Sequence, residues 1–384
     1  MIYLDYHATT PCDPRVVDAM LPYFRQFFGN PSSADHRPGR IAAEAVDTAR
    51  ARIAALIGAH PREIVFTSGA TESNNLAILG VADAARGDRK RIVTSAIEHK
   101  AILAPCEQLR SRGYDVVVLP VDRDGTVSLD ATRAAITDDT LLVSVHAANN
   151  EVGTLQSIAE IATLAHTHGA LMHTDAAQAV GKIPVDVDAW DVDLLSISAH
   201  KLYGPKGIGA LYVRDGARNH ALMARTFGGG QEWDIRPGTL NVPGIVGFGV
   251  ASQICAEEFT DEAARIAELR DLLEDGLFER IPDARRNGAL DKRLPGNSSL
   301  TFPGIEAHAL LANLPNLALS TGSACTSGAP EPSHVLQALG LMRDDASATI
   351  RVGLGRFTTR DEITGSIHEI AEAYAQLRTF SPVR

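Results

Sequence analysis

Between residues 63 and 213, short apolar runs alternate with longer stretches in which apolar residues recur at helical spacing. The runs predict strands, and the stretches between the earlier runs predict amphipathic helices. Strands are expected at residues 63–67, 91–95, 115–120, 140–146, 170–174, 194–196 and 208–213, and helices at 72–85, 102–112, 129–136 and 158–168. This order predicts an α/β fold with a seven-stranded, mostly parallel sheet covered by helices on both faces.

Two further helices are expected before this alternation begins. Asp13 and Pro14 suit the start of a helix, because Asp accepts hydrogen bonds from free backbone N–H groups and Pro has no N–H to leave unpaired. The first helix is predicted to run to about Phe28, with a kink at Pro22. The second is expected at residues 39–57, where apolar side chains share one face.

The pattern changes after residue 213. A glycine-rich segment leads into a long helix, expected from about Ile245 to Arg280, and the rest mixes helices with strands at 298–302, 317–319 and 348–352. A chain of 384 residues exceeds the usual size of a single core. We therefore predict a large domain of residues 13–255 and a small α+β domain formed by residues 1–12 and 256–384.

Composition narrows the function classes. The chain is 45% hydrophobic and 22% charged, as an ordinary globular protein is. A net charge of -11 argues against direct nucleic-acid binding, which requires a basic surface. Four cysteines without Cys-x-x-Cys spacing argue against a zinc site or a disulfide framework and fit a reducing compartment.

Targeting signals are not evident in the sequence. The N-terminal residues lack a basic segment followed by an apolar one, and no apolar run reaches the length of a membrane span. We therefore expect a cytoplasmic protein that does not enter a membrane.

Polar residues follow several predicted strands. Ala70 and Thr71 come after the strand at 63–67, in a glycine-containing turn that opens the next helix, where free N–H groups suit a phosphate. An ordinary capped turn would show the same residues. Lys201 follows the strand at 194–196, flanked by Ser198 and His200, and a partly desolvated lysine there can bind a carbonyl compound covalently. A surface lysine in a loop is the alternative.

Asp175 ends another apolar strand, where a carboxylate needs a cationic partner. The protonated pyridine nitrogen of pyridoxal 5'-phosphate (PLP) would be such a cation, and Gln178 can reach the same side. Capping of the next helix is the alternative for Asp175. His99 also follows a strand and is suited to stack on a flat ring and carry protons, although a single histidine can be structural.

The shared position of these residues matters more than any one of them. All lie at the carboxyl ends of predicted strands, where open α/β sheets bind their ligands. We therefore predict that these residues form one site. The histidines near residues 166–173 lack metal-ligand spacing, and we predict no metal.

Five sequence stretches closely resemble the NifS/IscS-type cysteine desulfurases, which are fold-type I, class V aminotransferase-like PLP enzymes. They read YLDYHATTP at 3–11, GATE at 69–72, NNEVG at 149–153, SAHKLYGPKG at 198–207 and SACT at 323–326. The resemblance covers nearly the whole chain, and the motifs occur in the family's order.

The resemblance implies a role for each matching residue. Lys201 corresponds to the lysine that binds PLP covalently, and Ala70, Thr71, Ser198 and His200 to the phosphate-binding positions. His99 corresponds to the stacking histidine, Asp175 to the partner of the pyridine nitrogen, and Gln178 to a neighbour of the ring oxygen. Asn150 matches a position near the cofactor and the substrate carboxylate, and Arg351 matches another position near that carboxylate. Thr239 matches a position that reaches the phosphate of the cofactor bound in the neighbouring subunit, which implies a homodimer.

The implied reaction converts L-cysteine to L-alanine and leaves the sulfur as a persulfide on Cys325. Small residues dominate positions 320–330, as expected of a loop that moves. The sulfur acceptor stays open between an iron–sulfur scaffold, tRNA thiolation and a DndA-like DNA phosphorothioation system. The alternatives are another PLP reaction on this fold, such as that of an aminotransferase, selenocysteine lyase or β-lyase, and an adaptor without activity.

Overall fold

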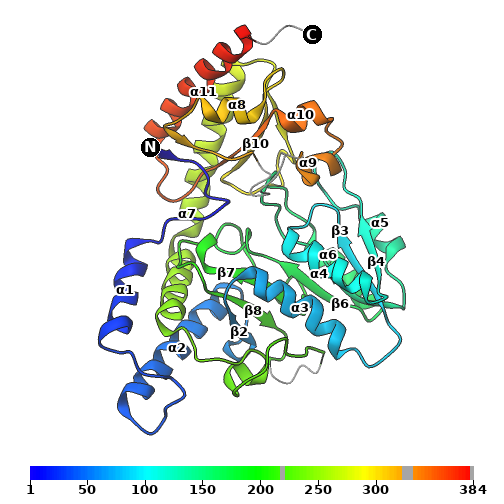
Figure 1. Cartoon of the computed structure of the whole chain (residues 1–384), viewed down its shortest axis with the longest axis vertical. Helices are drawn as coiled ribbons and strands as arrows, with labels where there is room; N and C mark the ends of the chain where they lie inside the picture. The colour runs from blue at the N-terminus through cyan, green and yellow to red at the C-terminus, as the bar shows by residue number, and fades with distance from the viewer. Residues whose placement is uncertain (217–220, 322–331, 381–384) are drawn as a thin grey trace.

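The computed structural model describes residues 1–216, 221–321 and 332–380. Figure 1 shows a large lower body built on one sheet and a smaller upper body, with the long helix α7 running between them. The sheet of the lower body positions the candidate site.

Seven strands form this sheet in the order β2-β8-β7-β6-β5-β3-β4. Their bounds are β2 Ile64–Thr67, β3 Arg91–Ser95, β4 Asp115–Leu119, β5 Thr140–Ser144, β6 Leu171–Asp175, β7 Leu194–Ser198 and β8 Gly209–Val213. Only β8 runs antiparallel to its neighbours, β2 and β7. The connection from β7 to β8 spans ten residues with no crossover helix, and so short a link reverses the chain rather than returning it parallel. The predicted mostly parallel, seven-stranded sheet is confirmed.

The helices agree with the predicted order and differ at their ends. In the large body they are α1 Pro14–Arg25, α2 Arg37–Leu56, α3 Ala70–Ala84, α4 Lys100–Ser111, α5 Leu129–Ala135 and α6 Ile158–Thr167, with short turns at Pro61–Glu63, Ala199–Lys201 and Gln231–Asp234. The predicted end of α1 at about Phe28 is wrong. The N–H groups of Gln26 and Phe27 both bond to the Pro22 carbonyl, which closes the last turn at Arg25.

The upper body contains a second, smaller sheet. Its strands are β9 Arg285–Asn287, β10 Asn297–Thr301 and β12 Thr349–Gly353, in the order β12-β10-β9. The first strand, β1 Ile2–Tyr3, pairs in parallel with β11 Leu317–Ala318, so the N-terminus joins this body. Its helices are α8 Ala307–Ala312, α9 His334–Ala338, α10 Arg343–Ser347 and α11 Arg360–Phe380.

Helix α7, Val242–Arg280, belongs to both bodies. Its first half, including Ile245 and Phe248, is buried in a core that also contains side chains of the seven-stranded sheet. Its second half, including Leu273 and Leu277, is buried in the core of the smaller sheet. The division at residue 255 stays a prediction, and this change of core along one helix supports it.

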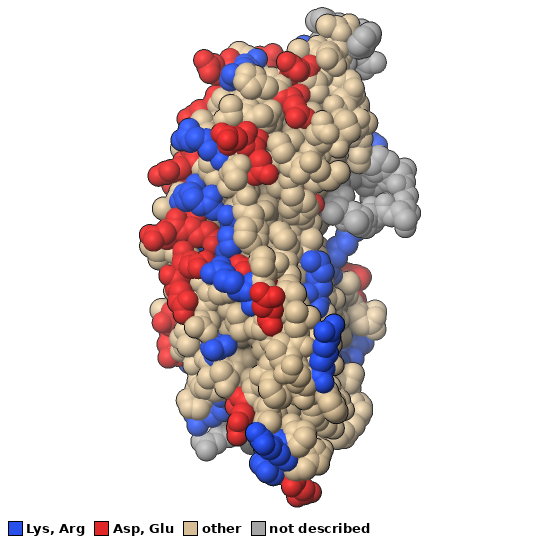
Figure 2. Space-filling model, turned by 90° about the vertical axis from the view of Figure 1, so that its left-hand side faces the viewer, with Lys and Arg blue, Asp and Glu red and all other residues tan. Residues whose placement is uncertain are grey.

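Figure 2 shows one face of the molecule, where acidic and basic side chains are intermingled beside a broad uncharged area. Among the coloured residues of this face, no continuous basic surface is seen. None of the helices in the described ranges is long and apolar enough to cross a membrane. Within those ranges, no three His, Cys, Asp or Glu side chains are grouped to hold a metal ion.

Candidate active site

A cavity of about 540 Å³ lies where β2, β3, β5, β6 and β7 end, closed by residues of β12 and of the N-terminal segment. It brings together most of the predicted site residues and their neighbours from the motifs. Among those lining it are Ala70, Thr71, His99, Asn150, Asp175, Gln178, Ser198, His200, Lys201 and Arg351. The cavity is open enough to admit a small molecule, and its wall is rich in groups that can hold one.

The N-terminus of α3 forms one end of the cavity. Gly69 precedes the helix with φ +150°, a backbone conformation that favours glycine, and no side chain caps this helix end. The backbone N–H groups at Ala70 and Thr71 therefore point to a place where an anion is stabilised by the helix dipole. Ser198 and His200 line the same cavity. Burial and the nearby charge of Lys201 lower the pKa of His200 to about 4, so its imidazole is neutral at pH 7.

Lys201 extends into the cavity from the short turn after β7. Its Nζ donates hydrogen bonds to the carbonyl oxygens of His7 at 2.5 Å and Ala8 at 2.8 Å. Burial, followed by the positive charge of Arg351, lowers the pKa of the Lys201 amine to about 8. A lysine with this pKa is partly neutral near pH 7, and only the neutral amine can attack a carbonyl carbon.

Asp175 is the last residue of β6 and is buried, with 8% of its surface exposed. One carboxylate oxygen accepts from Asn74 Nδ2 at 2.7 Å and the other from the Ala177 N–H at 2.9 Å. Both donors are neutral, so neither balances the charge of the carboxylate. A protonated ring nitrogen in the cavity would supply that balance.

Gln178 faces the cavity, but its amide is already engaged with protein groups. Its Oε1 lies 3.0 Å from His7 Nδ1 and accepts from Lys182 Nζ at 2.8 Å, while its Nε2 donates to the His7 carbonyl at 2.9 Å. The amide therefore ties the N-terminal segment to the segment after β6. This arrangement fixes its position at the cavity wall, and its predicted contact with a ring oxygen stays a prediction.

His99 begins α4, and its Nδ1 accepts a hydrogen bond from the Ala101 N–H at 3.1 Å. Since Nδ1 accepts, the proton of the neutral ring is on Nε2. Burial lowers the pKa of His99, which favours that neutral form. The ring is thus a neutral, flat group at the cavity wall, which suits stacking on a cofactor ring.

Arg351 reaches the cavity from β12 of the smaller sheet. Its Nη2 forms an ion pair with Asp5 at 2.7 Å, and its Nη1 donates to the Asn150 carbonyl at 3.1 Å. Its Nε is buried and has no hydrogen-bond partner among the described residues. A guanidinium with a free buried donor is suited to bind a carboxylate, because a second anion would satisfy that donor.

Taken together, these residues fit PLP. The uncapped start of α3 suits its phosphate, the partly neutral amine of Lys201 suits its aldehyde, and the unbalanced carboxylate of Asp175 suits its ring nitrogen. Among the polar residues of the wall that were not predicted are His7, Asn74 and His146. Asn74 lies one helical turn after Ala70 and so faces the same way, and its place in the cavity could have been predicted from this spacing. His7 and His146 had no comparable local signal.

One predicted residue lies elsewhere, and another is not described. Thr239 is exposed between the Gln231–Asp234 turn and α7, and it does not line the cavity of its own chain. Cys325 falls outside the described residues. Of the other cysteines, burial raises the pKa of Cys106 to about 12 and that of Cys255 to about 11, so both stay as thiols at pH 7 and are poor nucleophiles.

Sequence comparison places this chain among known proteins along its whole length. The family described as aminotransferase class-V matches residues 2–365. A protein named cysteine desulfurase IscS, from Aeromonas hydrophila subsp. hydrophila, is 52% identical over 384 residues, which covers 100% of this chain and 95% of that protein.

Solved structures have the same fold. A NifS-like protein superposes with a TM-score of 0.91 at 37% identity, over 98% of this chain and 100% of that chain. A structure described as SspA in complex with cysteine superposes with a TM-score of 0.83 at 40% identity, over 94% of this chain and 100% of that chain. The likeness therefore includes both the sheet that carries the cavity and the smaller body that closes it.

Proposed function

The chain belongs to the class-V aminotransferase family and is a PLP-dependent cysteine desulfurase, and from this premise we propose that Lys201 carries the cofactor and that Cys325 receives the sulfur of L-cysteine as a persulfide. The observation that carries the proposal is the partly neutral amine of Lys201, in one cavity with the buried carboxylate of Asp175 and the guanidinium of Arg351. The reaction needs an amine, an anion and a carboxylate-binding cation in one place, and the described chain has all three there.

Each cavity residue has a proposed part in holding the cofactor. The N–H groups at Ala70 and Thr71 would bind its phosphate together with Ser198 and His200, while Asp175 would pair with its ring nitrogen. His99 would stack on the ring, and Gln178 and Asn150 would lie beside it. When bound, PLP withdraws electrons from the α-carbon of an attached amino acid, which makes the α-proton acidic.

The protein's own groups then move protons and sulfur. Arg351 binds the carboxylate of L-cysteine, and Lys201, once neutral, accepts the α-proton. The Cys325 thiolate attacks the substrate sulfur, so an S–S bond forms and the C–S bond breaks. The electron pair of that bond returns to the carbon skeleton, which is protonated to alanine with Lys201 and His99 as the proton carriers.

Product analysis tests this function. With PLP, L-cysteine and a thiol reductant, the protein is expected to release L-alanine and sulfide in equal amounts, and mass spectrometry without reductant is expected to find one extra sulfur on Cys325. A β-lyase would form pyruvate and ammonia instead, and an aminotransferase would form alanine only from a keto acid. Either product pattern would contradict the proposal. Protein that stays colourless with added PLP would support the adaptor alternative.

We propose that the enzyme acts as a homodimer in the cytoplasm and passes its sulfur to an acceptor protein, which is an iron–sulfur scaffold or a thiolation or phosphorothioation enzyme. The exposed position of Thr239, outside its own cavity, supports shared active sites because that side chain is free to reach a second copy. Exposed apolar residues on α1, Leu21 and Phe24, offer surface that a second copy could cover.

Mixed dimers test this sharing. Lys201→Ala removes the amine from one site, and Thr239→Glu puts a carboxylate where the partner's phosphate would lie. Each variant alone is expected to be nearly inactive. Because half of the co-expressed dimers are mixed and each mixed dimer has one intact site, about a quarter of wild-type activity should return. If co-expression restores nothing, or if Thr239→Glu is fully active, the sites are not shared.

A further inference from the structure

The turn that carries Lys201 has an unusual backbone conformation two residues later. Tyr203 is buried, with 4% of its surface exposed, and has φ +64°, a left-handed conformation that is unfavourable for any residue with a side chain. Such a conformation persists only where the surroundings impose it. The contacts of Tyr203 therefore show what holds the Lys201 turn in place.

The N-terminal segment holds the backbone of this turn. Thr10 Oγ1 accepts from the Tyr203 N–H at 2.9 Å and donates to the His200 carbonyl at 3.1 Å, so one hydroxyl bridges the residues on either side of Lys201. The Asp13 N–H donates to the Tyr203 carbonyl at 3.0 Å. These bonds fix both sides of Lys201 to residues 10–13.

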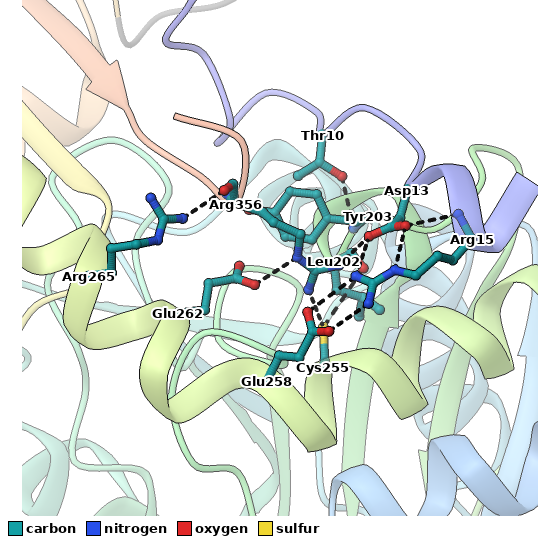
Figure 3. A network of polar contacts seen from close by, with 10 residues as sticks. All are labelled: Thr10, Asp13, Arg15, Leu202, Tyr203, Cys255, Glu258, Glu262, Arg265 and Arg356. Atoms are coloured by element: carbon teal, nitrogen blue, oxygen red, sulfur yellow. Dashed lines mark hydrogen bonds and ion pairs between the residues drawn. The ribbon is translucent and has the colours of Figure 1, made fainter. Parts of the chain in front are cut away.

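The side chain of Tyr203 is held by a residue of the other body. Figure 3 shows Arg356 extending across the Tyr203 ring, and its guanidinium carbon lies 4.2 Å from the ring centre. The backbone N–H of Arg356 also donates to the Tyr203 hydroxyl at 2.5 Å. Arg356 follows β12 by three residues, so this contact crosses from the smaller body to the Lys201 turn.

The guanidinium of Arg356 is itself held on three sides. Its Nη1 pairs with Asp13 at 2.8 Å, its Nε with Glu262 of α7 at 2.7 Å, and its Nη2 lies 3.8 Å from Cys255 Sγ. Only 8% of the side chain is exposed. A planar guanidinium satisfies two carboxylates and an aromatic face at once, which an ammonium group cannot do.

Arg356 and Arg351 belong to one short segment. Arg351 lies within β12, which is held by β10 on one side and by the ion pair with Asp5. Arg356 comes shortly after the end of this strand and contacts Tyr203, two residues after Lys201. Arg356 therefore connects the strand that carries the carboxylate-binding guanidinium with the turn that carries the lysine amine, although Arg356 does not line the cavity.

We propose that Arg356 is a positioning residue of the desulfurase reaction: by clamping Tyr203 it fixes Lys201 relative to Arg351. The inference rests on the proposed function, since it assigns these two residues to the amine and the substrate carboxylate. It predicts that loss of the clamp disturbs proton transfer at the α-carbon more than binding of the substrate carboxylate. Small misplacements of reacting groups slow a reaction strongly, whereas β12 keeps the carboxylate site intact.

Two variants of Arg356 and one control test the proposal. Arg356→Lys keeps a positive charge but loses the planar guanidinium. Arg356→Ala removes the side chain and leaves a cavity into which a guanidinium ion could fit. Arg15→Ala is the control, because Arg15 also pairs with Asp13, at 2.8 Å, but is half exposed and does not contact Tyr203. Both Arg356 variants are expected to lower kcat about 10- to 100-fold and to change KM for L-cysteine less than about 3-fold. Guanidinium ion, well below unfolding concentrations, should restore part of the kcat of Arg356→Ala only.

A second measurement separates this inference from the proposed function. The pH titration of the bound cofactor's visible absorption band reports the surroundings of Lys201 and needs no cysteine. Its midpoint should shift by about half a unit or more in Arg356→Lys and stay unchanged in Arg15→Ala. An unchanged kcat and midpoint in folded Arg356→Lys would overturn the proposal, as would a rise in KM alone. If the wild type released no alanine, the proposed function would be wrong, but the titration of the bound cofactor could still be measured and would still test the role of Arg356.

Discussion

Replacing Lys201 with alanine is expected to abolish the covalent attachment of PLP and to lower desulfurase activity by more than about 10³-fold. The physical reason is that the Lys201 amine is partly neutral, with a pKa of about 8, and lies in the cavity within hydrogen-bond reach of two backbone carbonyls that hold it there. Borohydride reduction followed by peptide mapping measures the attachment directly: wild-type protein should carry a reduced adduct at residue 201, and the variant none.

Lys206 provides a matched control for this prediction. It lines the same cavity, and its Nζ donates to the Thr10 carbonyl at 3.2 Å. Lys206→Ala removes a lysine from the cavity wall together with its bond to Thr10, but it leaves the Lys201 amine and its two carbonyl acceptors in place, so the adduct at residue 201 should be kept. An adduct that moved to residue 206, or one that persisted in Lys201→Ala, would show that the wrong lysine had been chosen.

Cys325→Ser is expected to separate cofactor chemistry from sulfur transfer. The variant should keep the visible absorption of bound PLP and the borohydride adduct at Lys201, because Cys325 has no proposed part in holding the cofactor. Sulfide release from L-cysteine under reductant should fall by more than about 10³-fold, since serine cannot take up sulfur as a persulfide. Absorption spectra and borohydride mapping measure the first effect, and quantifying sulfide and alanine side by side measures the second.

Cys12 offers the comparison thiol. It is partly buried, outside the cavity, and burial raises the pKa of its thiol. Cys12→Ser should therefore turn over cysteine at the wild-type rate. Undiminished turnover in Cys325→Ser would support a PLP enzyme of the same fold that needs no persulfide, such as an aminotransferase or a lyase.

Much of the fold could be predicted because its elements are marked locally. The seven apolar runs became the seven strands of the large sheet, and their order along the chain implied parallel neighbours. The reversed direction of β8 was not predicted from periodicity, because an apolar run reads the same in either direction. The end of α1 was misplaced by three residues, since the hydrogen bonds to the Pro22 carbonyl that close it leave no mark in the hydrophobic pattern.

The candidate site was predictable in part for a geometric reason. The residues that follow parallel strands meet at one edge of a sheet, so the strand pattern alone was enough to group Thr71, His99, Asp175 and Lys201, which do line one cavity. Arg351 could not be placed in this way. It comes from the second sheet, 150 residues after Lys201 in the chain, and only the resemblance to a family connected it with the cavity.

The sequence by itself determined the strand and helix order of the large sheet, the chemical groups available at its edge and the family to which they belong. The tertiary structure decided which segments cover that edge and what the coverage does to the groups. Burial beside Arg351 gives the Lys201 amine its lowered pKa, and the contacts of His7, Thr10, Tyr203 and Arg356 fix its position. Local periodicity specifies that a face is buried but not which distant segment buries it. Both the charge state and the position of Lys201 depend on which segment that is.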